Sequence, residues 1–192
     1  FRDEFDENSL VRYGSPTYFT ITNGYLKFAS TSGATKYAVV PIGSITVGTI
    51  TVDMQQVVIG GAGSYQAVYL GNYYLKLTPS WNFAGNGTLS LCRRSDNVVL
   101  GTYSVDKTEE QAMQTYTLEV SASSVVASYN GTPVITVSEG IVTTAGTAML
   151  VGSKVNSAEA CDFRFDNLQI SGTRVYQKPI HRGAMLGLYS TS

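Results

Sequence analysis

The chain has 192 residues, of which 43% are hydrophobic, and this is enough to form one domain with a substantial core. Its 13 basic and 14 acidic residues nearly cancel and form no run of one sign, which argues against nucleic acid as a partner. No apolar stretch reaches the roughly 20 residues of a membrane-spanning helix, so no membrane span is expected. The content of 19 glycines, 13 tyrosines and only 14% charged residues is typical of extracellular, cell-surface or virion proteins built from β-strands.

Apolar and polar residues alternate with a period of two along much of the chain, which predicts β-strands. Near the amino end, Asn23-Gly24 precedes such a run at residues 25–28 and predicts a hairpin turn. In residues 49–55, Ile50, Val52 and Met54 share one face, while Asp53 and Gln55 share the other. One face of this strand should meet the core, and the other should meet water or a ligand.

The next informative segment carries two adjacent tyrosines. In residues 73–77, Tyr73 shares a face with the two leucines and is a core candidate, whereas Tyr74 is a surface candidate. Trp81 and Asn82 follow within an expected loop at residues 79–83, where the indole could form an exposed platform. Packing against the core or the loop is the alternative interpretation of each aromatic residue.

The second half of the chain holds the single helical candidate and two further turn signals. Residues 106–113 contain good helix formers behind a candidate cap at Asp106, so at most one short helix is expected. Asn130-Gly131 follows another alternating run and predicts a second hairpin. In the last strand, Phe163 and Phe165 have the opposite parity to Leu168 and Ile170, which predicts a β-bulge near Asp166-Asn167.

The two cysteines leave two interpretations open. Cys92 and Cys161 could form one disulfide, or they could be separate buried thiols, because a pair this distant in sequence cannot be judged without coordinates.

So many short strands cannot lie in one flat sheet, which leaves two packed sheets or a closed barrel as the ways to bury one face of each strand. The closing segment at residues 163–170, FRFDNLQI, resembles the concanavalin A-like lectin/glucanase superfamily, including its LamG-like members, when read with Tyr129-Asn130-Gly131-Thr132 and the opening residues 3–6. The resemblance supports the sandwich. We therefore predict an all-β fold, a two-sheet antiparallel β-sandwich of the jelly-roll kind.

The predicted sandwich occupies residues 1–170 and leaves residues 171–192 as a C-terminal extension. This extension is too apolar for a purely solvated tail, since it contains Ile180, Met185, Leu186 and Leu188. It either lies back across its own sandwich or docks on another subunit or domain.

The sequence offers no recognisable reaction centre. His181, in the extension, is the only histidine, so a catalytic triad or a multi-histidine zinc site has little support. Catalytic members of the resembling fold carry an ExDxxE motif, which is absent. The segment with the most similar spacing contains Thr51, Asp53 and Gln56, and it retains only the aspartate of the motif. Because glycoside hydrolysis needs a pair of carboxyl groups, the sequence predicts that the chain is not an enzyme.

Glycan binding is better supported, because sugars stack their C–H faces on aromatic rings and pair their hydroxyl groups with polar side chains. The expected ligand-binding residues line one groove and are Tyr74, Trp81, Asp53, Gln55 and Asn82.

Sandwiches of the resembling family often tie their terminal strands together with a calcium ion, so calcium is the one cofactor considered. Its candidate ligands are Asp166 and Asn167 at the bulge, with Asp3 from the opening segment. Capping of turns by the same side chains is the alternative.

The function predicted from sequence is a non-catalytic carbohydrate-binding or adhesion domain of an extracellular or virion surface protein. Its partner would be a glycan or polysaccharide. The alternative is a structural module of a phage virion or surface appendage that assembles through residues 171–192, as a homo-oligomer or with other subunits.

Overall fold

A computed structural model describes residues 1–5, 13, 18–80, 83–155 and 160–175. In these residues the chain forms one 13-stranded antiparallel sheet and one short helix. The elements, in chain order, are β1 (Arg2–Asp3), β2 (Phe19–Thr22), β3 (Tyr25–Ser30), β4 (Ala34–Ile59), β5 (Tyr65–Leu70), β6 (Tyr73–Thr78), β7 (Gly87–Arg93), β8 (Val99–Val105), α2 (Lys107–Glu110), β9 (Gln114–Val120), β10 (Val125–Tyr129), β11 (Thr132–Val137), β12 (Gly146–Lys154) and β13 (Cys161–Val175).

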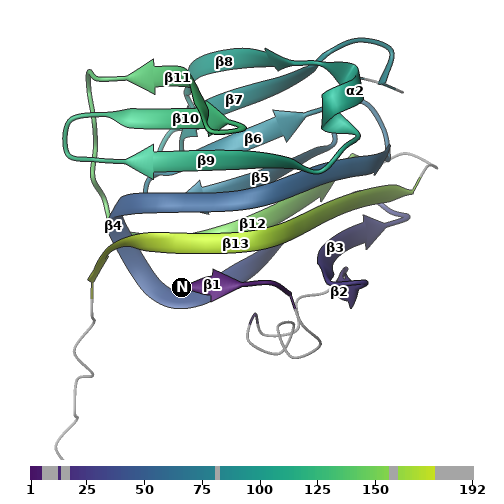
Figure 1. Ribbon diagram of the computed structural model, residues 1–192, viewed down its shortest axis with the longest axis horizontal. Helices are drawn as coiled ribbons and strands as arrows, with labels where there is room; N and C mark the ends of the chain where they lie inside the picture. Colours follow the sequence, from purple (N-terminus) through teal and green to yellow (C-terminus); the bar gives the residue numbers. More distant parts are fainter. Residues whose placement is uncertain (6–12, 14–17, 81–82, 156–159, 176–192) are drawn as a thin grey trace, which may run out of the picture.

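The long strand β4 turns this sheet into two layers (Figure 1). Its first half pairs with β12, and its second half pairs with β9 and β13. The front layer consists of β11, β10, β9, the second half of β4, and β13, extended by β1, β3 and β2; the back layer consists of the first half of β4, then β12, β5, β6, β7 and β8. The predicted jelly-roll β-sandwich is confirmed.

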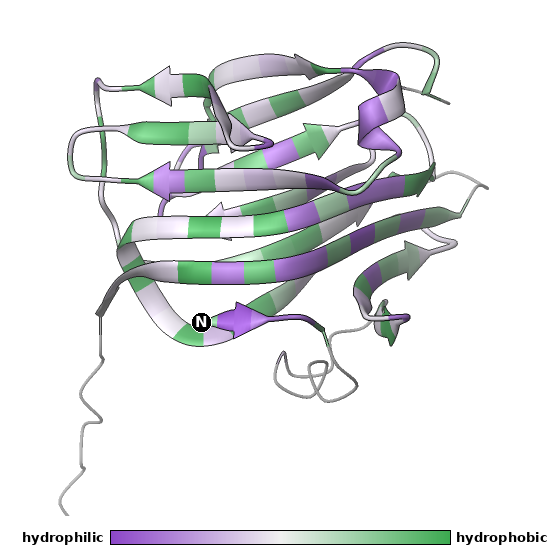
Figure 2. Ribbon diagram, viewed as in Figure 1, coloured by the Kyte–Doolittle hydropathy of each residue, from purple (hydrophilic) through white to green (hydrophobic). Residues whose placement is uncertain are grey.

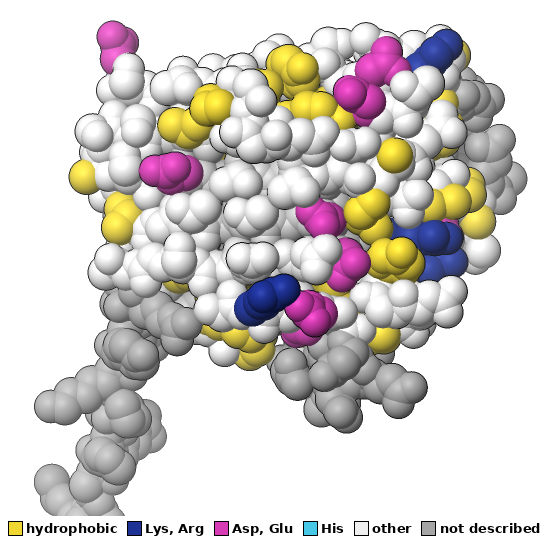
Figure 3. Space-filling model, in the orientation of Figure 1, with side chains coloured by type: hydrophobic (Ala, Val, Ile, Leu, Met, Phe, Trp, Pro, Cys, Tyr) yellow, Lys and Arg dark blue, Asp and Glu magenta, His cyan; other side chains and the backbone are white. Residues whose placement is uncertain are grey.

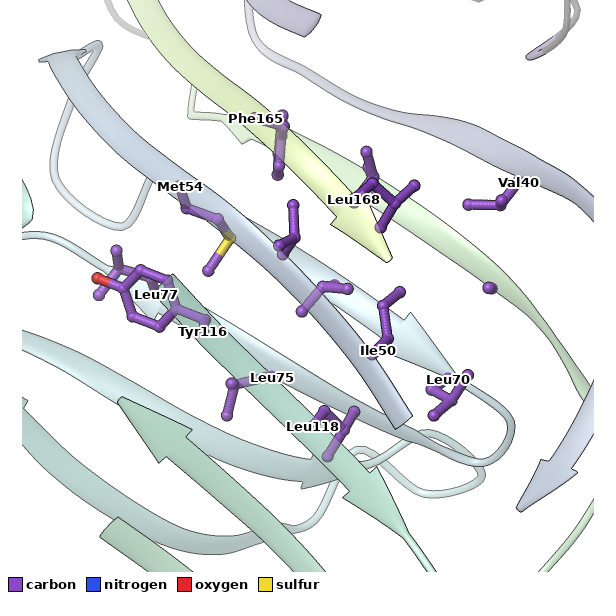
Figure 4. Packing of buried hydrophobic residues seen from close by; sticks show 14 of the residues in the cluster. Val40, Ile50, Met54, Leu70, Leu75, Leu77, Tyr116, Leu118, Phe165 and Leu168 are labelled. Atoms are coloured by element: carbon purple, nitrogen blue, oxygen red, sulfur yellow. The ribbon is translucent and has the colours of Figure 1, made fainter. Parts of the chain in front are cut away.

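The core lies between the two layers, and the longer strands contribute alternate residues to it (Figure 2). Ile50, Met54 and Leu118 of the front layer pack toward Leu70 and Leu75 of the back layer (Figure 4). All of these side chains are fully buried. Burial of a side chain of this size contributes about 1.5–3 kcal/mol each, so the core supplies the main stabilisation of the sandwich.

Both predicted hairpins have the positive φ values that an Asn-Gly turn requires. The φ angles are 53° and 80° at Asn23 and Gly24, and 48° and 77° at Asn130 and Gly131. The helix is shorter than predicted, because the chain enters β9 at Gln114 and pairs there with Met54. Asp106 caps the helix as expected, since its carboxylate accepts a hydrogen bond of 2.8 Å from the Thr108 amide.

The predicted bulge in the last strand is also confirmed. The register between β13 and β4 shifts after Asp166, and Asn167 has a φ of 49°. As a result, Phe165, Leu168 and Ile170 all reach the core. Strand β13 continues to Val175, past the predicted domain boundary at residue 170. Residues 176–192 lie outside the described residues, so the docking role of the extension stays a prediction.

The two cysteines are separate, free and buried. Cys161 lies in the core between the layers, whereas Cys92 belongs to a second cluster on the outer side of the back layer. The interpretation as two buried thiols is therefore the correct one of the two.

Candidate functional site

The outer side of the back layer carries an apolar and aromatic surface, which is unusual for a face that points away from the core. The register places Val39, Met149, Tyr69 and Tyr74 opposite one another on neighbouring strands β4, β12, β5 and β6. Residues directly opposite in adjacent strands share a face. We call this surface the tyrosine face and define it by the outward side chains of Tyr37, Val39, Tyr65, Tyr69, Tyr74, Lys76, Met149 and Val151.

Two of its tyrosines form a stacked pair. The ring centroids of Tyr69 and Tyr74 are 4.5 Å apart, with an angle of 10° between the ring planes. Burial is the main cause that raises the pKa of both phenols above the ordinary value, so both hydroxyl groups are neutral. Tyr37, by contrast, leaves 49% of its surface exposed. The face thus combines a fixed aromatic floor with a free aromatic side chain.

A pocket of about 420 Å³ opens over this floor. Its lining residues are Tyr37, Val39, Tyr69, Arg94, Asn97 and Met149. The Tyr74 hydroxyl lies 3.4 Å from Asn97 Oδ1, to which it donates a hydrogen bond. The volume lies within the range of about 300–1,000 Å³ that is usual for ligand sites, and an apolar floor with a few polar groups is their usual composition.

The charged lining residue of this pocket is Arg94, and a second cation, Lys76, lies elsewhere on the tyrosine face. The Arg94 guanidinium lies 5.7 Å from the centre of the Tyr69 ring, and Lys76 Nζ lies 5.6 Å from the centre of the Tyr65 ring. The neighbouring Arg93 is held by Asp96 in a two-pronged ion pair with a shortest distance of 2.6 Å. Among the lining residues of the pocket there is no Asp or Glu.

The structure does not bring the predicted ligand-binding residues into one groove. Tyr74 lies on the tyrosine face, but Asp53 and Gln55 point outward from the front layer, on the opposite side of the sandwich. Trp81 and Asn82 lie outside the described residues, so their predicted role stays a prediction. The alternation at residues 34–40, which puts Tyr37 and Val39 on one side, was the available signal for the residues that the prediction missed.

Asp53 is held firmly on the outer side of the front layer. The Thr115 hydroxyl donates to Asp53 Oδ1 at 2.6 Å, and the Asn167 amide donates to Oδ2 at 2.7 Å. Gln55 donates to the carbonyl of Gln111 at 2.8 Å. Asp166 stands opposite Asp53 in the register, and burial, followed by the charges of Asp53 and Glu4, raises the pKa of Asp166. Figure 3 shows acidic side chains gathered on this side of the molecule.

The three predicted calcium ligands do not converge. Asp3 is buried opposite Leu168 on the core side of the sheet, and its Oδ1 accepts a hydrogen bond of 2.8 Å from the Phe5 amide. Asp166 and Asn167 are directed to the outer side with Asp53. Within the described residues, no three His, Cys, Asp or Glu side chains are placed to hold a metal. These three side chains therefore do not fit a calcium site, and calcium binding itself stays a prediction.

In the described part of the chain, no helix has the length and hydropathy needed to span a membrane.

No protein-family profile and no curated protein sequence matches the chain. Solved structures do match its fold. The Crh5 transglycosylase in complex with NAG has a TM-score of 0.67 at 10% identity, over 91% of this chain and 84% of that one. The Bacillus licheniformis β-glucanase has a TM-score of 0.61 at 12% identity, over 81% and 83%. The laminarinase catalytic domain from Thermotoga maritima has a TM-score of 0.64 at 11% identity, over 91% and 98%.

At such low identity these similarities show the fold, which is the concanavalin A-like jelly roll of glucanases. They also require a correction. The prediction that the chain is not an enzyme is wrong as it stands, because the solved structures that share this fold include glucanases, laminarinases and a transglycosylase. That prediction depended on the absence of the ExDxxE motif. Such a motif detects only carboxyl groups that lie along one strand, whereas a sheet can also place two carboxyl groups opposite each other on neighbouring strands.

Proposed function

We propose that the chain is a carbohydrate-active protein that binds a glycan along the tyrosine face. The observation that carries the proposal is that Tyr69, whose ring stacks on the buried Tyr74, lines one pocket with the exposed Tyr37 on the outer side of the sheet. Sugar rings present apolar C–H faces, and an aromatic floor of this kind is their natural partner in water.

Polar groups at the edge of the pocket support the same ligand. Arg94, Asn97 and the Tyr37 hydroxyl surround the aromatic floor and can pair with the hydroxyl groups of a sugar. The face extends over β4, β12, β5 and β6, which suits several sugar units of a polysaccharide better than one small molecule. The proposal also includes a location outside the cell, at the cell surface or in a virion, with an adhesion or structural role there. Amino-acid composition is the only support for this location and role.

The first prediction concerns Tyr37. Because this side chain is about half exposed, Tyr37→Ala should leave the fold intact and weaken glycan binding at least about tenfold, the effect of losing roughly 1.4 kcal/mol of stacking. The ligand would be found on a glycan array, and its affinity would be measured by calorimetry. Tyr25→Ala, at a partly exposed tyrosine of β3, is the matched control and should bind normally. A folded wild-type protein that binds no glycan, or a Tyr37→Ala variant that binds as well as wild type, would refute the proposal.

Hydrolysis of a glycan is a second candidate function, and one observation favours it. Asp53 and Asp166 face each other across β4 and β13, and their environments differ. Asp53 accepts two hydrogen bonds, while burial raises the pKa of Asp166. Two carboxyl groups with unlike environments are what a glycoside hydrolase needs, one as the proton donor and the other as the nucleophile or base. This candidate places the glycan on the front layer.

The second prediction tests that candidate with reducing-end assays on β-1,3-1,4-glucan, β-1,3-glucan and mucin. Wild type should release reducing ends, and Asp166→Asn should lower the rate at least about a hundredfold through loss of the proton donor. Asp162→Asn, in the same strand but bound to Lys27 and Arg164, is the control and should retain the rate. Activity that survives both Asp166→Asn and Asp53→Asn would exclude the pair, as would a wild-type protein without activity on any of these glycans.

A further inference from the structure

Several cations in the described part of the chain form ion pairs with carboxylates, whereas the two cations of the tyrosine face do not. Lys27 and Arg164 both bind Asp162, at 2.9 and 3.2 Å, and Arg93 binds Asp96. Arg94 and Lys76 form no such ion pair with any described residue, and the contacts recorded for their charged groups are with the faces of tyrosine rings.

The hydrogen-bond donors of Arg94 are available to a ligand. Its guanidinium lies 5.7 Å from the centre of the Tyr69 ring and donates no side-chain hydrogen bond to a described residue. Lys76 stands on the same strand and the same face as Tyr74, and its neighbour across β5 is Ala67, which offers no polar group. Both cations are therefore oriented by aromatic rings without being neutralised.

Arg94 also lines two pockets. It lines the aromatic pocket and a second pocket of about 460 Å³, whose other lining residues include Ser44, Asn72, Ser95 and Thr147. The lining residues of the second pocket, like those of the first, include no Asp or Glu. A ligand that crosses from the aromatic floor to these hydroxyl and amide groups must pass Arg94.

From this arrangement we propose that the glycan of the tyrosine face is anionic, a polysaccharide that bears carboxylate or sulfate groups, and that Arg94 and Lys76 bind those groups. The inference rests on the proposed glycan-binding function. A planar guanidinium binds carboxylate and sulfate oxygens in a two-pronged way, and a charged hydrogen bond is roughly twice as strong as a neutral one. The net charge of the chain is −1, so a preference for polyanions would arise at this face and not from the overall field of the protein.

Calorimetry with three probes tests the inference: polygalacturonate, a sulfated galactan and the neutral β-1,3-1,4-glucan, each at low and high salt. Wild type should bind one of the anionic polymers at least about tenfold more tightly than the neutral one, and salt should reduce that difference. The polymer that binds more tightly identifies carboxylate or sulfate as the recognised group. The variant Arg94→Gln/Lys76→Gln should lose the preference, so that its affinity for the anionic polymer falls to that for the neutral glucan.

Arg93→Gln is the matched control, because it removes one positive charge beside the site from a side chain already bound to Asp96. It should keep the preference. Equal wild-type affinity for neutral and anionic polymers, or a preference unchanged in the double variant, would overturn this inference and leave the glycan-binding proposal standing. Absence of binding to all three probes and to every glycan of an array would overturn both.

Discussion

Substitution of Glu110 by Gln is expected to stabilise the fold at pH 8 by on the order of 3 kcal/mol. Glu110 ends α2 and has no exposed surface, and both of its carboxyl oxygens lack a hydrogen-bond partner among the described residues. Its carboxyl group lies directly against Gly87 of β7, where even a methyl group would overlap it. A buried charge without a partner is among the costliest groups in a folded protein.

The pH dependence follows from the direction of the pKa change. Burial, and to a smaller extent the charge of Asp106, raises the pKa of Glu110 from 4.5 to about 7 in the folded state. The folded state therefore binds the proton more tightly than the unfolded state. The stability that this proton provides is present below about pH 4.5 and is lost as the pH rises to about 7. Tyr116 of β9 is the other titratable group that interacts with this carboxyl, and burial keeps it neutral by raising its pKa.

Urea unfolding at pH 5 and pH 8 measures the effect. Wild type should be less stable at pH 8, and the advantage of Glu110→Gln should shrink from about 3 to about 1 kcal/mol at pH 5. Glu109→Gln, at the exposed neighbour in the same helix, controls for the loss of one negative charge and should leave the pH dependence unchanged. If Glu110→Gln has the wild-type stability at pH 8, the carboxyl is not buried as a charge.

The sequence predicted the features of the fold that depend on neighbouring residues. The hairpin at Asn130-Gly131 depends only on the positive φ angles of these two residues. The bulge after Phe165 depends only on the change in which residues face the core, whatever the strand pairs with. Glu110 shows the limit of such reasoning. Two adjacent glutamates in a short helix are usually solvated, but Glu110 is buried, because Gly87, which is distant in sequence, leaves a space for its carboxyl group.

The tyrosine face could not be predicted for a similar reason. Tyr74 points away from the core side of its strand, but the prediction of a surface position is wrong, because Tyr74 is buried in the cluster on the outer side of the back layer. Parity does not tell which layer a strand joins. Tyr69 and Tyr37 reach the same surface only because β12 lies between β4 and β5, and Arg94 enters it from the turn after β7. Asp53 and Gln55 were judged by the same alternation and lie on the other side of the sandwich.

Gly152 allows the back layer that carries this face to pack closely against the front layer. Gly152 of β12 lies against the ring of Phe28 from β3, and a Cβ at this position would overlap the ring. Phe28 cannot move aside easily, because its ring centre lies 5.4 Å from that of Phe19 and 6.1 Å from that of Phe163. Gly152→Ala is therefore expected to cost about 3 kcal/mol of unfolding free energy, at the upper end of overpacking effects.

A double-mutant cycle separates this contact from a general intolerance of side chains in β12. Phe28→Leu shortens the side chain against Gly152, so the cost of Gly152→Ala should fall by at least about 1 kcal/mol in that background. Gly85→Ala, whose added methyl group would meet Ser80 at 3.4 Å and no other described residue within 4 Å, should be nearly neutral. Equal costs of Gly152→Ala in the wild-type and the Phe28→Leu backgrounds would contradict the packing argument. Because Met149 and Val151 of the same strand point to the tyrosine face, a shift of β12 in Gly152→Ala should also weaken glycan binding, and Phe28→Leu should partly restore it.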